Sequence, residues 1–260
     1  MDAAEISVCA IVPVYDHEHA IGRVVERLLK LDLPVLLVDD GSHADCARVL
    51  DELAKHERVM LIRLPQNGGK GITVCKGLLA AHAAGYTHAI QVDADGQHAI
   101  EDAPRFVAEA HRLPRHLICG LPIFDASIPK ARFYGRYLTH VLVWVETLSL
   151  EIRDSMCGFR LYPLAQAGAL IGSKHIGARM DFDTEMIVRW YWEGHRTAWL
   201  PTRVVYPLDG VSHFRMFLDN ARMVGLHARL MAGMLIRVPW LLRQRLAGKA
   251  EAERSRGVNA

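Results

Sequence analysis

Four short apolar runs in the first half of the chain are each followed by a cluster of polar residues. Helical patterns separate the runs, and this alternation predicts strand–helix–strand crossover units and a mostly parallel sheet. The carboxyl ends of the strands in an open parallel sheet share one edge, which is where such folds bind ligands. The runs are 6–14, 35–38, 59–64 and 88–92, and the clusters after them are Tyr15-Asp16, Asp39-Asp40-Gly41-Ser42, Asn67-Gly68-Gly69-Lys70-Gly71 and Asp93-Ala94-Asp95. The sequence therefore predicts an α/β protein with a ligand site at that edge.

The rest of the chain is less regular. Apolar spacing predicts helices at 102–112, 130–148 and 182–192, and short strands at 117–119, 197–200 and 203–206. A basic, apolar helix is predicted from 218 to about 237, where Pro239 interrupts it. We expect a first domain at 1–217, a C-terminal amphipathic helical segment at 218–246 and a disordered charged tail at 247–260.

Composition narrows the class of protein. A length of 260 residues with 51% hydrophobic content suits one large domain with a buried core. The formal net charge of +2 gives no electrostatic indication of a nucleic-acid partner. The five cysteines are scattered without metal-ligand spacing, which predicts reduced thiols in a cytoplasmic protein. No cleaved signal peptide is expected at residues 1–6. The sequence has no apolar run of about 18 residues, so no helix that spans a bilayer is expected.

The cluster after the fourth run carries the clearest chemistry. Asp93 and Asp95 lie two residues apart just past a buried strand, so both carboxylates can reach one hard divalent cation. Mg²⁺ and Mn²⁺ favour oxygen ligands and often bridge to phosphate oxygens of a substrate, and the amide oxygen of Gln97 could add a third ligand. A polar turn that caps the next helix is the alternative. The presence of the other three clusters favours the metal site.

Two of the other clusters suit a nucleotide. Backbone amides of the glycine-rich loop 67–71 could face phosphate or ribose, although the loop lacks the P-loop pattern. A carboxylate of Asp39 or Asp40 could accept a hydrogen bond from a base N–H or a ribose hydroxyl. Taken alone, each cluster could equally be an ordinary strand-to-helix junction.

As an ordered set, these motifs and two later ones resemble glycosyltransferase family 2, whose members have the GT-A fold, a Rossmann-like sheet flanked by helices. The resemblance covers roughly residues 6–207 and is greatest to polyprenyl-phosphate sugar transferases of the dolichyl-phosphate mannose synthase type. It rests on Ile11-Val-Pro-Val-Tyr-Asp16, Val38-Asp-Asp-Gly-Ser42, Asn67-Gly-Gly-Lys-Gly71, Asp93-Ala-Asp-Gly-Gln-His98, Asp154-Ser-Met-Cys-Gly-Phe-Arg160 and Phe182-Asp-Thr-Glu-Met186. The first motif departs from the family's usual Tyr-Asn-Glu, because Tyr15 is followed by Asp16 and His17.

The resemblance implies a role for each matching residue on the donor side. Arg132 and Arg136, one helical turn apart, could neutralise phosphate charge, and a solvated basic face is the alternative for them. The nucleoside pocket would be lined by Pro13, Tyr15, Asp39 or Asp40, with Lys70 beside it, and the metal under the donor diphosphate would be held by Asp93, Asp95 and Gln97.

On the acceptor side, the resemblance indicates Asp154 as the acidic residue nearest the acceptor. An acceptor hydroxyl needs a general base to remove its proton, whereas a lipid phosphate is already ionised and needs none. Asp183 and Glu185, at the start of a predicted helix, could line the acceptor mouth or be structural.

A narrower resemblance, of segment 209–220, is to transferases found with aryl-polyene pigment lipid pathways in bacteria. It implies that Ser212, His213 and Arg215 lie in a loop that closes over the donor phosphates. Because this segment differs from the polyprenyl-phosphate group, the sequence slightly favours a hydroxyl acceptor.

The expected function is inverting, metal-dependent transfer of a sugar from a UDP- or GDP-linked donor to a lipid-type acceptor, either an aryl-polyene lipid or a polyprenyl phosphate. Metal and arginines would stabilise the leaving nucleoside diphosphate electrostatically. A nucleotidyltransferase is the enzyme alternative, disfavoured because its glycine- and arginine-rich signature is absent after the first strand. A non-catalytic nucleotide-sugar-binding scaffold is the alternative from another class.

We also expect peripheral contact with the inner face of a membrane through the C-terminal helix. Apolar residues are expected on one broad side of this helix: Met223, Val224, Leu230, Met231, Met234 and Leu235. Arginines are expected on the opposite side: Arg222, Arg229 and Arg237. Packing of this helix on the domain is the alternative.

Overall fold

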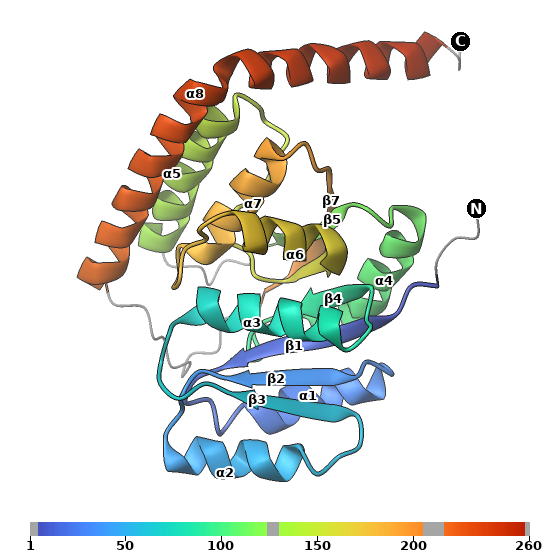
Figure 1. Cartoon of the computed structure of the whole chain (residues 1–260), viewed down its shortest axis with the longest axis vertical. Helices are drawn as coiled ribbons and strands as arrows, with labels where there is room; N and C mark the ends of the chain where they lie inside the picture. Colours follow the sequence, from blue (N-terminus) through green and yellow to red (C-terminus); the bar gives the residue numbers. More distant parts are fainter. Residues whose placement is uncertain (1–4, 124–129, 205–215, 258–260) are drawn as a thin grey trace.

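The computed structural model describes residues 5–123, 130–204 and 216–257, and the side chains in these ranges except those of 130–134, 216–217 and 246–257. A seven-stranded sheet in the order β3-β2-β1-β4-β6-β5-β7 lies at the centre, with helices on both faces (Figure 1). The strands are β1 (Val8–Val14), β2 (Val35–Asp39), β3 (Val59–Arg63), β4 (His88–Gln91), β5 (Leu117–Ile123), β6 (Arg160–Pro163) and β7 (Thr197–Arg203). The helices are α1 (Ile21–Lys30), α2 (Ala44–Leu53), α3 (Lys70–Ala83), the 3₁₀ turn η1 (Ile100–Asp102), α4 (Ala103–Arg112), α5 (Lys130–Thr147), α6 (Leu164–Ser173), α7 (Phe182–Trp192) and α8 (Met216–Gly257).

The pairing of the strands places the polar clusters at one edge. β1 lies between β2 and β4 and is parallel to both, and β3 continues the parallel set beyond β2. β6 enters antiparallel between β4 and β5, and β7 pairs parallel with β5. The expected mostly parallel α/β sheet is confirmed, while β6 and α6 are elements that the apolar pattern did not predict. Because β1 to β4 run the same way, the clusters that follow them lie at their common carboxyl edge.

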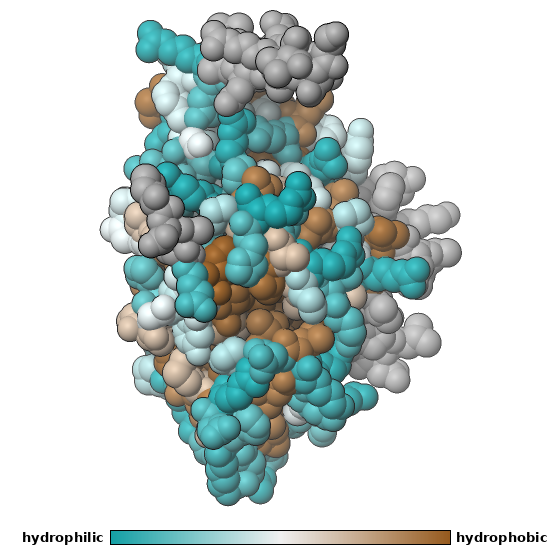
Figure 2. All heavy atoms as spheres, turned by 90° about the vertical axis from the view of Figure 1, so that its right-hand side faces the viewer, coloured by the Kyte–Doolittle hydropathy of each residue, from teal (hydrophilic) through white to brown (hydrophobic). Residues whose placement is uncertain are grey.

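Two hydrophobic clusters form the core, one on each face of the sheet. Side chains of a strand alternate between its faces, so Cys9 and Ile11 of β1 join one cluster while Ala10 and Val12 join the other. Helices α1, α2 and α4 cover the second cluster, and α3, α6 and α7 cover the first, with α5 and α8 outside them. On the face shown in Figure 2, hydrophobic atoms gather near mid-height, between hydrophilic ones.

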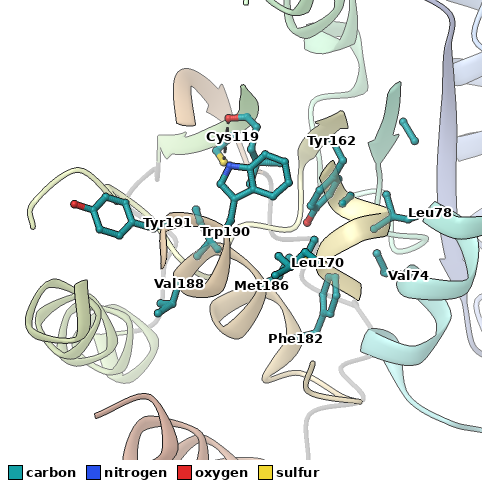
Figure 3. Close-up of a cluster of buried hydrophobic side chains, with 14 of the residues drawn as sticks. Val74, Leu78, Cys119, Tyr162, Leu170, Phe182, Met186, Val188, Trp190 and Tyr191 are labelled. Atoms are coloured by element: carbon teal, nitrogen blue, oxygen red, sulfur yellow. Dashed lines mark hydrogen bonds between the residues drawn. The ribbon is translucent and has the colours of Figure 1, made fainter. Parts of the chain in front are cut away.

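Helix α7 is buried along nearly its whole length. Phe182, Met186 and Trp190 point from α7 into a cluster that also holds Val74 and Leu78 of α3 (Figure 3). This packing fixes the start of α7 against the start of α3. This packing brings the carboxylate of Asp183 toward the edge of the sheet.

Helix α8 packs along α5 and then bends away from it (Figure 1). Pro239 lies inside α8, so the prediction that it interrupts the helix is wrong. A proline removes one backbone hydrogen bond and crowds the preceding turn, which bends a helix without ending it where the flanking turns are held. Helix α8 also extends to Gly257 and overlaps the tail expected to be disordered. The domain limits stay predictions.

The strand region near the end of the sheet differs from expectation in one further detail. β7 is one strand, Thr197–Arg203, where two short strands at 197–200 and 203–206 were predicted; residues 205–215 lie outside the described part of the chain. Among the described residues, none of the helices combines the length and apolar character that crossing a membrane requires.

Candidate active site at the carboxyl edge of the sheet

Asp40 fixes the glycine-rich loop that precedes α3. Its Oδ1 accepts a hydrogen bond from the backbone amide of Gly68 at 2.7 Å, and its Oδ2 accepts one from Gly69 at 2.8 Å. Gly69 has a φ of 99°, and a Cβ there would approach the carbonyl oxygen of Ala178 to 2.7 Å, so the loop needs glycine at this position. The Asp40 carboxylate, only 2% exposed, is thus engaged within the protein.

Asp39 is engaged in the same way. Its Oδ1 accepts a hydrogen bond from the Ser42 amide at 2.9 Å and its Oδ2 one from Arg63 Nε at 2.7 Å. The structure therefore shows both carboxylates of the pair shaping the edge of the site. Their expected contacts with a base or ribose stay predictions.

A largely buried lysine between two aspartates forms the centre of the site. Lys70 begins α3, and its Nζ lies 2.9 Å from Asp93 Oδ1, which follows β4. The same Nζ lies 3.0 Å from Asp183 Oδ2 on α7. Gln91 Nε2 donates a longer hydrogen bond of 3.4 Å to Asp183 Oδ1. Three elements that are distant in sequence thus meet at one ammonium group.

The charges of this cluster stabilise one another. Burial alone would raise the pKa of Asp93, but Lys70 and His98 lower it to about 2. Burial alone would lower the pKa of Lys70, but Asp183 and Asp93 raise it above its ordinary value. Asp93 and Lys70 therefore stay charged through the neutral range, and the edge presents carboxylate oxygens and a fixed cation together.

Gly158 allows the 154–160 segment to approach this cluster. A Cβ at Gly158 would lie 2.9 Å from both Gln91 Nε2 and Lys70 Nζ, and 3.0 Å from Asp93 Oδ2. Any larger residue would have to displace the lysine or the carboxylate, because the side chains here are closely packed. The segment that carries Asp154 is therefore held directly against the Lys70–Asp93 pair.

Asp95 and Gln97 lie in the turn after Asp93, and both are half-buried. The Gln97 amide donates to Asp95 Oδ1 at 3.0 Å, the polar turn that the sequence offered as an alternative. The turn and a metal site are compatible, since Mg²⁺ commonly takes one or two carboxylates and completes its shell with substrate phosphates and water. Among the described residues no three His, Cys, Asp or Glu side chains converge as a metal cage. Asp93, Asp95 and Gln97 offer oxygen donors, the type of ligand that such a cation takes, and their role as its ligands stays a prediction.

The polar cluster after β1 contacts the polar cluster after β2. Pro13 lies in β1 opposite Val38, and Tyr15 follows it, half-buried. Asp16 has a φ of 52°, and its Oδ1 accepts a hydrogen bond from the His43 amide at 2.8 Å. The departure from the family pattern thus places a carboxylate in contact with the neighbouring loop.

Arg136 and Asp154, expected on the donor and acceptor sides, bind each other. Arg136 Nε and Nη2 donate to the two Asp154 oxygens at 2.7 and 2.6 Å, and the amides of Met156 and Cys157 donate to Oδ1 at 2.9 and 2.8 Å. Burial alone would raise the pKa of Asp154, but His140 and Arg136 lower it to about 2. The alternative of a solvated basic face is wrong for Arg136, whose side chain is largely buried.

Asp183 and Glu185 do not share a location. Asp183 joins Lys70, whereas Glu185 Oε2 accepts the Gly177 amide at 2.8 Å and Glu185 Oε1 accepts Arg189 Nε at 2.8 Å. Residues two apart on a helix point about 200° apart, which separates them. The side chain of Arg132 lies outside the described residues, as do Ser212, His213 and Arg215.

The sequence analysis missed three residues that the structure brings to this region: Gln91, His140 and Gly158. His140 had a usable signal, because it follows Arg136 by four residues and so lies on the same helix face. Gly158 lies in the 154–160 motif, but no role was predicted for it. Gln91 had no signal beyond being a polar residue inside an apolar strand.

Comparison with known proteins places the chain in a family. The model for glycosyl transferase family 2 matches residues 9–162. The chain belongs to this family. The expectation of a glycosyltransferase of family 2 is thereby confirmed.

Similar proteins and structures agree with that placement. A dolichyl-phosphate β-glucosyltransferase of Dictyostelium discoideum is 26% identical over 206 residues, which cover 70% of this chain and 61% of the relative. The Drosophila melanogaster protein of the same name is 29% identical over 210 residues, covering 72% and 63%. The matched part is thus less than two thirds of these two relatives. Glucosyl-3-phosphoglycerate synthase from Mycobacterium tuberculosis, solved with Mn²⁺, UDP and glucosyl-3-phosphoglycerate, superposes with a TM-score of 0.60 at 14% identity, over 90% of this chain and 80% of that one. This likeness confirms the expected GT-A-like fold.

Proposed function

We propose that this chain transfers a sugar, with inversion, from a UDP- or GDP-linked donor to the phosphate of a polyprenyl-type lipid. The observation that carries the proposal is the state of Asp154. Its carboxylate accepts hydrogen bonds from Arg136 and from two backbone amides, and its pKa is lowered to about 2. Such a carboxylate is a weak base, so an acceptor that is already ionised suits the site better than a hydroxyl. The likeness to dolichyl-phosphate β-glucosyltransferases supports the same acceptor.

On the donor side, the residues after β4 would hold the diphosphate. Asp93, Asp95 and Gln97 would hold Mg²⁺ or Mn²⁺, which supplies positive charge to the leaving diphosphate when it is bound. The Mn²⁺ and UDP of the mycobacterial structure support a divalent ion here. Lys70 adds a fixed ammonium at the same edge, kept in place by Asp93 and Asp183.

The nucleoside would lie over the polar clusters that follow β1 and β2. Pro13 and Tyr15 remain the proposed wall of this pocket. Asp39 and Asp40 would support it from behind, because their oxygens already bind Arg63 and the glycine-rich loop. The Gly68 and Gly69 amides ahead of α3 already donate to Asp40, so α3 would favour an anion here through the partial positive charge of its N-terminus.

We further propose that α8 contacts the membrane that holds the acceptor, through an apolar face that points away from the domain. The inner face buries Leu226, Leu230, Met234 and Leu241 against the domain. The outer face exposes Val224, Leu235, Ile236 and Leu242, with Val224 70% and Ile236 81% exposed. Positions 221, 224, 228, 232, 235, 239 and 242 recur at helical spacing and include no charged residue. An exposed apolar stripe of this length suits the interface of a lipid bilayer.

The faces of α8 differ from the expected ones. Leu230 and Met234, expected on the membrane side, are buried against the domain. Arg229 Nη2 lies 3.4 Å from Glu185 Oε2, and the Arg237 guanidinium lies 4.6 Å from the ring of Trp192. These two arginines thus hold α8 to the domain, and the exposed Arg243 and Arg245 remain to meet anionic head groups. The proposed contact therefore keeps Val224 and Leu235 of the expected face, which are exposed, and excludes Leu230 and Met234.

Sugar transfer measured with the full chain tests the proposed function. The donors are a panel of UDP- and GDP-linked sugars, and the acceptors are vesicles that contain either a polyprenyl phosphate or the corresponding polyprenol. We expect glycosylated lipid phosphate with one donor of the panel, and no product in chelator. Transfer to the polyprenol alone would overturn the phosphate acceptor. Isothermal titration with UDP and GDP, with and without Mn²⁺, separates an enzyme from a scaffold, for which no metal-linked binding is expected.

The aryl-polyene acceptor has less support. Its resemblance rests on segment 209–220, most of which lies outside the described residues. An aryl-polyene hydroxyl would also require a base, and Asp154 is poorly suited to that task.

A further inference from the structure

Arg179 lies at the carboxyl edge of the sheet, in the turn that precedes α7, and none of the sequence motifs assigns it a role. Its Nη1 donates a hydrogen bond to the side-chain oxygen of Asn67 at 2.9 Å. Asn67 begins the glycine-rich loop that follows β3. A Cβ at Gly69 would overlap Arg179 Cγ, so the arginine side chain passes directly over this loop. Two segments that are distant in sequence thus form one polar pair.

The backbone that carries Arg179 is held in place from three directions. The carbonyl of Ala178 accepts a hydrogen bond from the Ile72 amide of α3 at 3.1 Å. The Arg179 amide donates to Asp181 Oδ1 at 3.1 Å, and the Arg179 carbonyl accepts from the Phe182 amide at 3.2 Å. A side chain with a fixed backbone at one end and a hydrogen bond at the other is already positioned for a ligand.

The Arg179–Asn67 pair offers mainly hydrogen-bond donors to a ligand. A guanidinium group can only donate, so the Asn67 amide must turn its oxygen toward Arg179 and its Nδ2 away from it. Within the described ranges, Asn67 Nδ2 has no hydrogen-bond partner, and the Arg179 guanidinium forms no ion pair with an acidic side chain. Both residues are half-buried, so part of each remains open to a ligand. The free N–H groups therefore suit an acceptor atom of a bound molecule.

The position of the pair indicates which part of the donor it would meet. A Cβ at Gly41 would lie 2.9 Å from the Asn67 amide nitrogen, so Asn67 lies against the turn after β2. The nucleoside is proposed over that turn, whereas the diphosphate is proposed at the end of β4. In the sheet, β3 and β4 are three strand spacings apart, which is about 14 Å. The pair thus adjoins the nucleoside on the side away from the diphosphate.

We propose that Arg179 and Asn67 recognise the base of the donor nucleotide and select a base with a keto oxygen, O4 of uracil or O6 of guanine. The inference rests on the proposed function, since it concerns the same donor. Cytosine and adenine carry an amino group at the corresponding position. An amino group is a donor, so it would leave the N–H groups of the pair without an acceptor. A site built to hydrogen-bond one polar group rejects an analogue that lacks it.

Binding of nucleoside diphosphates to the full chain tests the proposal without any acceptor. Isothermal titration with Mn²⁺ compares UDP with CDP and GDP with ADP. We expect the wild type to bind the keto member of one pair at least about tenfold more tightly than the amino member. Arg179→Met keeps an unbranched apolar side chain but removes its donors. This variant should bring the ratio close to one, mainly by weakening the binding of the keto member.

A second variant guards against a local loss of structure in Arg179→Met. Asn67→Asp keeps an oxygen for Arg179 and replaces the Nδ2 donor with a second acceptor. The preference for the keto base should fall again, because the amino group of cytosine or adenine now finds an acceptor. Thermal unfolding shows whether each variant is folded. Arg112→Met is the matched control, in the last turn of α4 before β5, where the side chain is 77% exposed, and it should keep the wild-type ratio.

Several results would overturn the inference. Equal affinity of the wild type for both members of both pairs would do so, as would a wild-type ratio in Arg179→Met and Asn67→Asp. An equal loss for both members in Arg179→Met would show that the guanidinium binds a phosphate instead of the base.

The inference and the proposed function can fail separately. If the wild type glycosylates a hydroxyl instead of a lipid phosphate, the proposed function is wrong, and the base preference with its loss in the two variants still supports the inference. If sugar transfer to the lipid phosphate is found but both variants keep the base preference, only the inference is wrong. A wild type that binds none of the four nucleotides would overturn both.

Discussion

The Lys70 ammonium lies 2.9 Å from one carboxylate oxygen of Asp93 and 3.0 Å from the other, in a contact that α7 completes through Asp183. Asp93 therefore has a structural contact in addition to its proposed role as a metal ligand. Asp95, by comparison, binds the backbone amide of Gln97 in a half-buried turn. Removing each carboxylate should have different consequences.

We predict that Asp95→Ala removes most sugar transfer while costing about 1 kcal/mol of stability, because it loses one hydrogen bond from a backbone amide. Asp93→Ala should also remove transfer and should cost about 2 kcal/mol, because it breaks a largely buried ion pair. Transfer assays and urea unfolding measure the two effects. EDTA should reproduce the loss in the wild type. Full activity of Asp95→Ala in chelator would contradict the metal assignment.

Gly158→Ala should impair the site without unfolding the protein. The new Cβ would lie 2.9 Å from Lys70 Nζ and 3.0 Å from Asp93 Oδ2, so the pair must shift. Overpacking of this kind typically costs about 1–3 kcal/mol, and we expect turnover to fall more than stability does. The control is Gly172→Ala on α6, where a Cβ would meet nothing within 4 Å. Equal transfer rates for the two variants would show that the close approach has no catalytic consequence.

The depressed pKa of Asp154 predicts how stability changes in acid. Its folded pKa of about 2 lies below the ordinary value of 3.8, so its contribution is present above pH 3.8 and is lost as the pH falls toward 2. The size is on the order of 2 kcal/mol, because the group is almost fully buried. Urea unfolding of the wild type and Asp154→Asn at pH 5, 3.5 and 2.5 measures it. The variant should lose less stability over this range, and parallel curves would contradict the prediction.

The outer face of α8 should be necessary for vesicle binding. Leu235→Glu places a charge on that face, and we expect it to abolish flotation with anionic liposomes while leaving the domain folded. Leu79→Glu introduces the same charge at a 40% exposed position of α3 and should float like the wild type. Transfer to a water-soluble short-chain acceptor should be equal in both variants. Unchanged flotation of Leu235→Glu would rule out this face as the contact.

Much of the fold follows from local sequence patterns. The first four strands were predicted within two residues of their bounds, and helices were predicted between them, because buried strands and amphipathic helices have distinct apolar periods. The parallel direction of those strands then predicted that Asp40, Lys70 and Asp93 lie at one edge. β6 was missed because Arg160–Pro163 is short and carries an arginine, which is buried here by hydrogen bonds to the carbonyls of Asp183 and Ser155.

The sequence by itself determined which residues lie at the edge of the sheet and which chemistry they offer. The order of strands and helices along the chain, and the apolar period of each, can be read from local sequence. Only the tertiary structure decided what those residues bind. Asp183 reaches Lys70 because the apolar face of α7 packs against α3, and Asp154 is held by Arg136 and His140 because α5 packs beside the 154–160 segment. The orientation of α8 was open for the same reason. Both of its faces are apolar, so periodicity could not distinguish them, and packing against α5 and α7 selected the one that is buried.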